Sequence, residues 1–356
     1  YKNFTTRMLD KIYKLISNMF SQKTALFATI IYAFSPIVIL SARMSYHTSL
    51  IPLFMLLFIY SLFKFIKGNK YHFPLAIFSL SVLYNLELQA SMLGILFVIV
   101  TFFGFLKKEN WFKNILSKKI LIFSLAAFLI PMLPILIYDI NNGFPQTIVF
   151  AGWIMYKGVS FLIKLVEGGS TGFSIYISIL DYFYEFIRKL IFMQNGIISL
   201  IIFLLSLIVV FYKIFKEKVT KDENLGIFIV TIIFLFLVGG ILVSKTPSDA
   251  YLMSLFIPSI ILISIMLDYI TNNKKRYLLS ISIVLLISFL NMYHLISSDY
   301  FTGIKKNFGP NLMDRTKTVK EIIKDSGEKS ITVIGRGEGS QFESFTDNYK
   351  YLLWFY

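Results

Sequence analysis

The chain has 356 residues, of which 56% are hydrophobic and 15% charged, with a formal net charge of +15 and no cysteine. A soluble domain carries roughly a quarter of its residues as charges, so this composition excludes an ordinary soluble domain. The lack of cysteine excludes disulfides, thiolate metal sites and thiol nucleophiles. Because apolar runs of about 20 residues separate the charged clusters, the sequence predicts membrane-spanning helices.

Residues 1–23 are basic, and their apolar side chains fall on one helical stripe that includes Met8, Ile12 and Met19. This pattern predicts either a helix on the inner membrane surface or a cytosolic connector between two spans. Nine predicted spans follow. They cover residues 24–41, 49–66, 71–88, 90–106, 119–138, 191–212, 225–243, 250–270 and 277–296. A re-entrant pair is the alternative for spans three and four.

The basic residues orient these spans. The segments that flank the predicted spans fall alternately on the two sides of the membrane. Those on the side of the N-terminus hold 20 Lys and Arg residues, and the loops on the opposite side hold six. Positive charge marks the cytoplasmic side, so we predict a multi-pass protein of the plasma (inner) membrane with a cytoplasmic N-terminus and an extracytoplasmic C-terminus. The same distribution explains the net charge without a nucleic-acid partner.

The predicted fold is an all-α polytopic bundle with a small C-terminal α/β piece. A long outer loop at 139–190 carries aromatic residues suited to the headgroup layer, among them Trp153, Tyr156 and Tyr182. In the tail, residues 314–325 and 345–356 predict helices and Ser330 to Ile334 a short strand. The predicted parts are a cytoplasmic amphipathic segment at 1–23, five spans within 24–138, the outer loop at 139–190, four spans within 191–296, and the extracytoplasmic tail at 297–356. Tyr1 is not an initiator Met and the chain ends in an apolar run, so we expect a piece of a longer protein.

Polar residues that the topology places at the outer face are candidates for function, because ionisable groups near membrane depth are costly. They are Arg43, His47, Glu87, Asp139, Lys245, Asp249 and Tyr251. The Arg43 guanidinium is suited to a phosphate, and Lys245 is assigned to the same phosphate-binding rim. The other five are predicted to line one polar cleft.

Four of these candidates also have a simpler interpretation. The alternative for Arg43 is an arginine whose guanidinium extends to the membrane interface, and the alternative for His47 is a polar loop residue. Glu87 is equally a loop-tip carboxylate in headgroup water, and Asp139 fits a turn with side-chain caps. Gly335, Gly337 and Gly339 are predicted to form a plain turn rather than a dinucleotide fingerprint, because position 340 is Ser.

Several short motifs together resemble the GT-C glycosyltransferases, the group of dolichyl-phosphate-mannose protein mannosyltransferases and bacterial lipid A aminoarabinose transferases. The first is Ala33-Phe-Ser-Pro36, followed by Ser41-Ala-Arg43, Ser49-Leu50 and Pro52-Leu-Phe. The second is Leu136-Ile-Tyr-Asp139-Ile-Asn-Asn-Gly143-Phe, and the third is Asp249-Ala-Tyr251-Leu with Pro258. The resemblance covers most of residues 5–300.

The resemblance implies an enzyme that transfers a sugar from a polyprenyl-phosphate carrier to a glycan, lipid or protein acceptor outside the membrane. An acidic residue in the family's first outer loop acts as base, in some branches with a divalent metal. That loop is expected before Tyr1, so no catalytic residue and no metal ligand is named in this chain. A lipid or polysaccharide transporter or flippase, and a non-catalytic envelope-assembly protein, are the alternatives. A transporter is expected to show internal repeats and broken helices. Pro131 and Pro134 in the fifth predicted span are the only close pair of helix-breaking residues, and no matching pair is found in another span.

Overall fold

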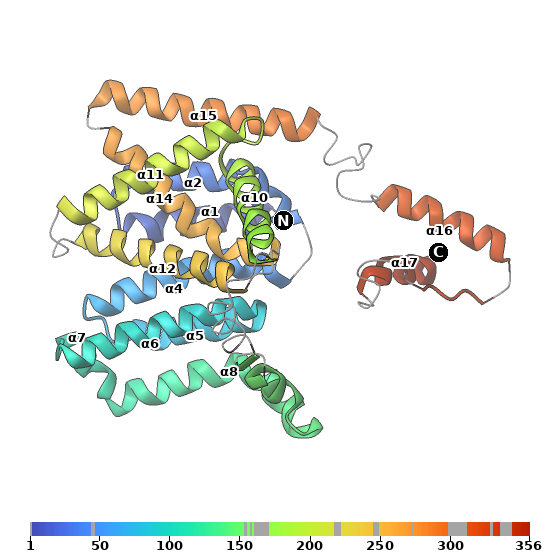
Figure 1. The fold of residues 1–356 in the computed structure, drawn as a ribbon, viewed down its shortest axis with the longest axis horizontal. Helices are drawn as coiled ribbons and strands as arrows, with labels where there is room; N and C mark the ends of the chain where they lie inside the picture. The colour runs from blue at the N-terminus through green and yellow to red at the C-terminus, as the bar shows by residue number, and fades with distance from the viewer. Residues whose placement is uncertain are drawn as a thin grey trace. The chain divides into compact units, whose positions relative to one another are not determined.

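A computed structural model describes most of the chain as helices (Figure 1). The described residues are 2–43, 47–152, 155–156, 159, 171–216, 222–244, 249–271, 273–297, 312–327, 330–334 and 344–356. They divide into two units, Tyr1–Asn291 and Met292–Tyr356.

The first half of the helical bundle consists of α1 Lys2–Ser17, α2 Gln22–Phe34, α3 Pro36–Arg43, η1 His47–Leu50, α4 Ile51–Ile66, α5 His72–Leu86, η2 Leu88–Ala90, α6 Ser91–Leu106, α7 Asn110–Lys113, η3 Asn114–Leu116 and α8 Lys118–Asn142. The second half consists of α10 Thr171–Ile191, α11 Gly196–Lys216, α12 Asp222–Ser244, α13 Asp249–Leu252, η4 Met253–Leu255, α14 Phe256–Ile270 and α15 Lys274–Ser297. Each of the nine predicted spans therefore coincides with a helix or a pair of helices.

The count of nine spans is not confirmed. Among the described residues six helices are long and apolar enough to cross a membrane, and two bent pairs raise that number to eight. One pair is α2 with α3, bent by 61°. Pro36 begins α3, and because proline has no N–H it cannot bond the carbonyl four residues earlier in a continuous helix. The helix at span three, α5, has only 15 residues and is too short on its own.

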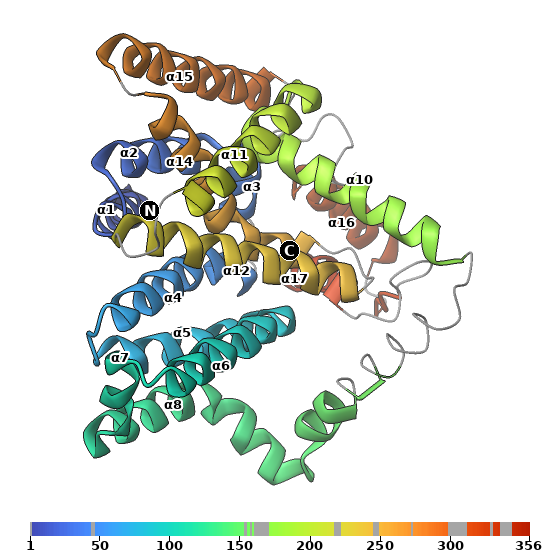
Figure 2. The ribbon, with the colours of Figure 1, turned by 60° about the vertical axis from the view of Figure 1, so that its left-hand side comes forward.

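The long helices run side by side, so their connections gather at two ends of the bundle (Figures 1 and 2). One end, which we call the lysine end, holds the connections after α1, α4, α6, α11 and α14. Asn114 Nδ2 donates to the Gly68 carbonyl over 3.4 Å, and Lys23 Nζ donates to the Thr271 carbonyl over 3.3 Å. The opposite end, the loop end, holds η1, η2, the turn after α8, and η4. The candidates at 43, 47, 87, 139 and 251 thus share one end.

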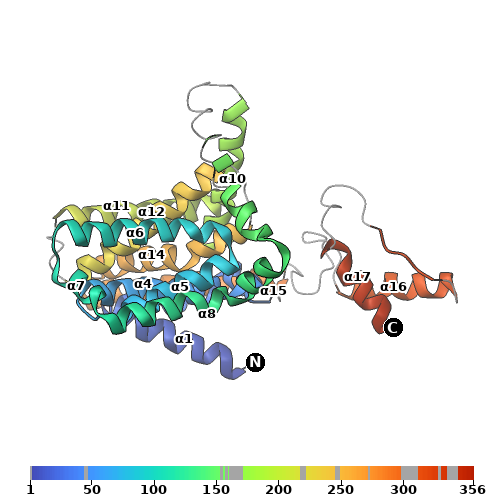
Figure 3. The same ribbon diagram turned by 90° about the horizontal axis from the view of Figure 1, so that it is seen from below.

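The apolar stripe of α1 packs on the bundle. Ile12 and Ile16 are each 1% exposed and belong to the main core, and α1 packs against α2 and α4. Figure 3 shows α1 along one side of the long helices. The stripe predicted from sequence is confirmed as a buried face, whereas its place relative to the membrane stays a prediction.

The C-terminal unit contains α16 Leu312–Ser326 and α17 Ser344–Phe355, as predicted. The two helices pack on each other, with Val319 and Leu352 buried. The predicted strand at 330–334 is wrong, because these residues have no regular secondary structure. A strand needs a neighbouring strand for its backbone hydrogen bonds, and none is found among the described residues. The α/β description of this piece is therefore not supported.

Candidate functional site

The turn after α8 is built around Asp139. Gly143 ends α8 with φ +79°, a left-handed conformation that glycine adopts without strain. The Asp139 carboxylate is fully buried and accepts hydrogen bonds from the Gln146 and Thr147 backbone N–H groups, over 2.8 and 2.9 Å, and from Thr147 Oγ1 over 2.6 Å. These N–H groups begin the helix over residues 145–152, so the carboxylate caps it. The geometry matches the interpretation of Asp139 as a turn with side-chain caps.

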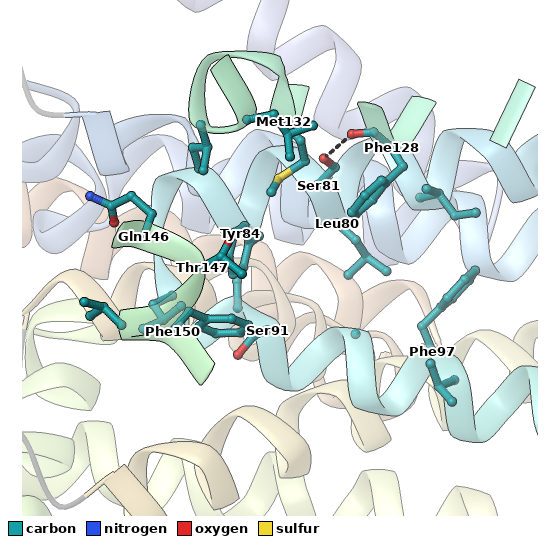
Figure 4. A pocket seen from close by; sticks show the side chains of 18 residues that line it. Leu80, Ser81, Tyr84, Ser91, Phe97, Phe128, Met132, Gln146, Thr147 and Phe150 are labelled. Atoms are coloured by element: carbon teal, nitrogen blue, oxygen red, sulfur yellow. Dashed lines mark hydrogen bonds between the residues drawn. The ribbon is translucent and has the colours of Figure 1, made fainter. Parts of the chain in front are cut away.

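This turn closes one end of an apolar cavity of about 710 Å³ between α5, α6, α8 and the helix over 145–152 (Figure 4). Leu80, Phe97 and Phe128 form part of its apolar wall. Gln146 and Thr147 lie at one end of the cavity in Figure 4, and Phe97 lies toward the other. The volume is within the usual range of small-molecule sites, and a mostly apolar wall with a few polar groups at one end suits an amphipathic ligand.

The polar groups of the cavity lie toward the loop end. Tyr84 on α5 is half-buried and packs edge-on against Phe150, with ring centroids 5.3 Å apart. Ser81 lies one turn earlier, and its hydroxyl donates to the Phe128 carbonyl over 2.9 Å, which ties α5 to α8. The cavity thus runs from an apolar interior to a polar rim near the end of α5.

Three of the predicted site residues lie at the same loop end of the bundle as that rim. Arg43 is the last residue of α3, and His47 begins η1, which packs against α5. Glu87 caps the C-terminus of α5, is half-buried, and donates its backbone N–H to the Leu83 carbonyl over 2.9 Å. The side chains of Arg43 and His47 lie outside the described residues. The fold therefore brings the backbone of these three positions to one end, as expected from the topology.

The remaining candidates come from the segment before α14. Lys245 lies outside the described residues. Asp249 begins α13, with a side chain that is not described, and Tyr251 on the same helix is half-buried. Tyr251 accepts a hydrogen bond at its carbonyl from Ser254 Oγ over 2.7 Å. A common cleft of these residues with Arg43 stays a prediction.

A second, smaller cavity of about 230 Å³ lies between α3, α10 and α13, and the sequence analysis did not single out its acidic residues. Asp181, Glu185 and Lys189 line it at a spacing of four residues, so they share one face of α10. Ile37 on α3 lines it as well. That spacing on an amphipathic helix is the signal that would have identified these residues.

Glu185 is held in an ion-paired network. Its Oε1 and Oε2 accept from Arg188 Nε and Nη2 over 3.0 and 2.7 Å, a two-bond geometry typical of Arg–carboxylate pairs. This hydrogen bonding and the positive charges of Arg188 and Lys189 hold the pKa of the Glu185 carboxyl below its usual value. Arg188 Nη1 also donates to the Met193 carbonyl over 2.7 Å, so the network fixes the turn between α10 and α11.

A divalent metal finds no ready set of ligands in the described part of the chain. No three His, Asp or Glu side chains come together there as metal ligands would. Glu185, which lines the smaller cavity with Asp181, is already paired with Arg188. The residues described do not fit a metal site, and no chemical step is derived through one.

Comparison with known proteins bears on the same helices. Residues 8–138 match the sequence model of a family described as Dolichyl-phosphate-mannose-protein mannosyltransferase. The predicted resemblance is confirmed over this region. It extends from α1 into α8 and includes Arg43, His47 and Glu87, as well as most of the wall of the large cavity. Neither a curated protein nor a solved structure matches the chain. Residues 8–138 of this polytopic helical bundle therefore carry the sequence pattern of a membrane glycosyltransferase family.

Proposed function

We propose that the protein transfers a sugar from a polyprenyl-phosphate carrier to an acceptor on the extracytoplasmic side of the membrane. The observation that carries the proposal is the family match over residues 8–138. In the described part of the chain, the six to eight helices able to cross a membrane support it, since such a carrier is dissolved in the bilayer.

The large apolar cavity is our proposed place for part of the carrier's prenyl chain. Its wall is formed by helices whose outer faces are apolar and exposed, with Phe102 on α6 56% exposed and Leu125 on α8 59% exposed. Such surfaces are suited to lipid contact, because lipid chains pack against apolar side chains and a helix forms its backbone hydrogen bonds internally. A prenyl chain in the cavity places its phosphate toward the polar rim at Tyr84 and Gln146.

The reaction forms a bond between an acceptor oxygen and the anomeric carbon of the sugar. The bond from that carbon to the carrier phosphate breaks, and the polyprenyl phosphate leaves with the electron pair. We assign Arg43 to this phosphate, because a guanidinium donates two parallel hydrogen bonds to an oxyanion and stays charged. The acceptor proton goes to a base that the described residues do not identify.

The location of the reaction follows from charge. The lysine end carries most of the basic residues in the connections, which favours the cytoplasmic side for that end. The loop end, with Arg43 and Glu87, then faces out of the cell.

The test is a transfer assay. Membranes containing the protein expressed from its own gene are given a radiolabelled polyprenyl-phosphate sugar, and label is followed into membrane acceptors. Arg43→Ala is expected to lower transfer by about a hundredfold or more, the range seen when a donor to a developing oxyanion is removed. Arg276→Ala, which removes an arginine from the lysine end, is the matched control and leaves transfer unchanged.

The level of folded protein is measured for both variants. Equal losses of transfer and folded protein in Arg43→Ala would give Arg43 a structural role and remove it from the phosphate site. Movement of the labelled lipid across the membrane without transfer to an acceptor would contradict the enzyme and favour a flippase.

A further inference from the structure

The connection between α6 and α8 concentrates positive charge at the lysine end. Lys107, Lys108, Lys113, Lys118 and Lys119 fall within 13 residues, and Glu109 is the only acid among them. All five lysines are exposed. None of them forms an ion pair with another described residue. We call residues 107–119 the lysine connection.

The lysine connection packs against the bundle. α6 and the α7–η3 segment meet at 105°, and the Trp111 ring lies against Gly104 near the end of α6. A Cβ at Gly104 would lie 2.1 Å from the Trp111 ring, so the ring packs directly on the α6 backbone. Trp111 also packs edge-on against Phe65 of α4, with centroids 5.0 Å apart.

Further contacts fix the inner side of the connection. Ile115 is 8% exposed, and Asn114 Nδ2 reaches the Gly68 carbonyl in the neighbouring turn. Trp111, Ile115 and the Asn114 amide therefore face the protein, whereas the five lysines and Leu116 are exposed. A preformed surface of this kind needs little ordering when it binds a ligand.

Large apolar side chains lie directly beside these charges. Phe105 and Leu106 at the end of α6 are 57% and 55% exposed, and Leu121 and Ile122 near the start of α8 are 48% and 56% exposed. Exposed apolar surface on two membrane-spanning candidates marks contact with lipid chains. The exposed side chains change from apolar to lysine where α6 ends and α8 begins. This change places the lysine connection at the depth of the lipid headgroups.

We propose that the lysine connection is a binding site for anionic phospholipid, with the lysines on the headgroup phosphates and the exposed ends of α6 and α8 against the acyl chains. The charge sign selects an anionic headgroup, and the adjoining apolar surface selects a lipid over a free phosphate ion. Each basic residue near an anionic surface strengthens association about fivefold. This site is separate from the proposed transfer reaction, and it does not depend on which side of the membrane the lysine end faces.

The experiment compares lipids at the protein surface. The purified protein is placed in phosphatidylcholine vesicles with a trace of spin-labelled phosphatidylglycerol or spin-labelled phosphatidylcholine, and the motionally restricted fraction of each label is measured. The wild-type protein is expected to restrict the phosphatidylglycerol label at least fivefold more strongly. In 1 M NaCl the preference is expected to disappear, since the screening length falls to about 3 Å.

Substitutions locate the site. Lys108→Gln, Lys113→Gln and Lys119→Gln together are expected to lower the preference at least fivefold, whereas arginine at the same three positions retains it. Lys317→Gln, Lys320→Gln and Lys324→Gln on α16 remove the same charge from the other unit and leave the preference unchanged. The melting temperature in pure phosphatidylcholine checks that each variant is folded.

Three results would overturn the proposal. The first is a preference unchanged in the triple glutamine variant. The second is an equal loss on changing Lys274, Lys275 and Arg276 at the start of α15, which would make the effect a diffuse property of the whole end. The third is loss of the preference with inorganic phosphate but not with NaCl of equal ionic strength, which would identify a free-phosphate site.

Discussion

Filling the large cavity tests its role most directly, and Gly94 on α6 offers the means. Gly94 lines the cavity, and a Cβ built there meets no heavy atom within 4 Å. Gly94→Leu therefore adds four carbon atoms on the cavity side of α6, and the first of them meets no protein atom. Because glycine costs about 1 kcal/mol in a helix relative to good helix formers, the folded protein is expected to be as stable as the wild type or slightly more so.

The substitution is expected to weaken binding of the prenyl chain in the cavity instead. A prenyl chain gains little by leaving other hydrocarbon, so its binding depends on packing. Crowding a packed apolar space costs about 1–3 kcal/mol, which corresponds to about a 5- to 150-fold rise in KM for the lipid-linked donor. The assay is initial-rate transfer at varied donor concentration, with folded protein measured in parallel.

Gly239→Leu on α12 is the matched control. Gly239 is also a helical glycine with no heavy atom within 4 Å of a built Cβ, and it does not line the cavity. It is expected to leave KM unchanged. A wild-type KM in a well-folded Gly94→Leu protein would show that the donor does not enter the cavity, while the family-based proposal of a transferase would stand.

Two further changes probe the local structure around the site. Asp139→Ala removes the acceptor for the first N–H groups of the helix over 145–152, so hydrogen exchange at Gln146 and Thr147 is expected to accelerate about threefold or more, with Asp325→Ala as an unaffected control; unchanged exchange would show that water replaces the cap. Glu185→Gln is expected to lower the unfolding free energy by about 0.2–1 kcal/mol at pH 7 in mild detergent, a small effect because the pair is partly exposed. The lowered pKa of Glu185 means that its ion pair stabilises the fold above the pKa of the unfolded chain and is lost as pH falls through the folded value. The difference from wild type should therefore shrink in acid, and a difference that persists there would assign the effect to packing.

Helix positions were well predicted because their cause is local. Apolar runs such as 225–243 and 277–296 cannot satisfy their backbone in lipid except as helices, and α12 and α15 occupy them. The break at Pro36 was not predicted, since the hydrophobic pattern indicates one span over residues 24–41, although it follows from the missing N–H of one residue. The strand at 330–334 failed for the opposite reason, because a strand exists only with a partner that local pattern does not supply.

The candidate site was predictable only in part. The order of spans and loops determined that positions 43, 47, 87 and 251 come to one end, since successive helices reverse direction. The role of Asp139 depended on the turn at Gly143, which brings two N–H groups onto its carboxylate. The face formed by Asp181, Glu185 and Lys189 became a cavity wall only because α3 and α13 pack beside α10.

By itself, the sequence determined that this is a polytopic membrane protein, where its helices lie and which family it resembles, because hydrophobic length and short motifs are local properties. Only the tertiary structure decided which apolar faces are buried and which are exposed. α1 buries its stripe on α2 and α4, whereas α8 exposes much of its length and leaves a cavity beside α5 and α6. Hydrophobicity cannot distinguish a face that meets lipid from one that meets another helix, since both partners are apolar. The packing of whole helices makes that choice, and with it sets the cavity and the lysine connection.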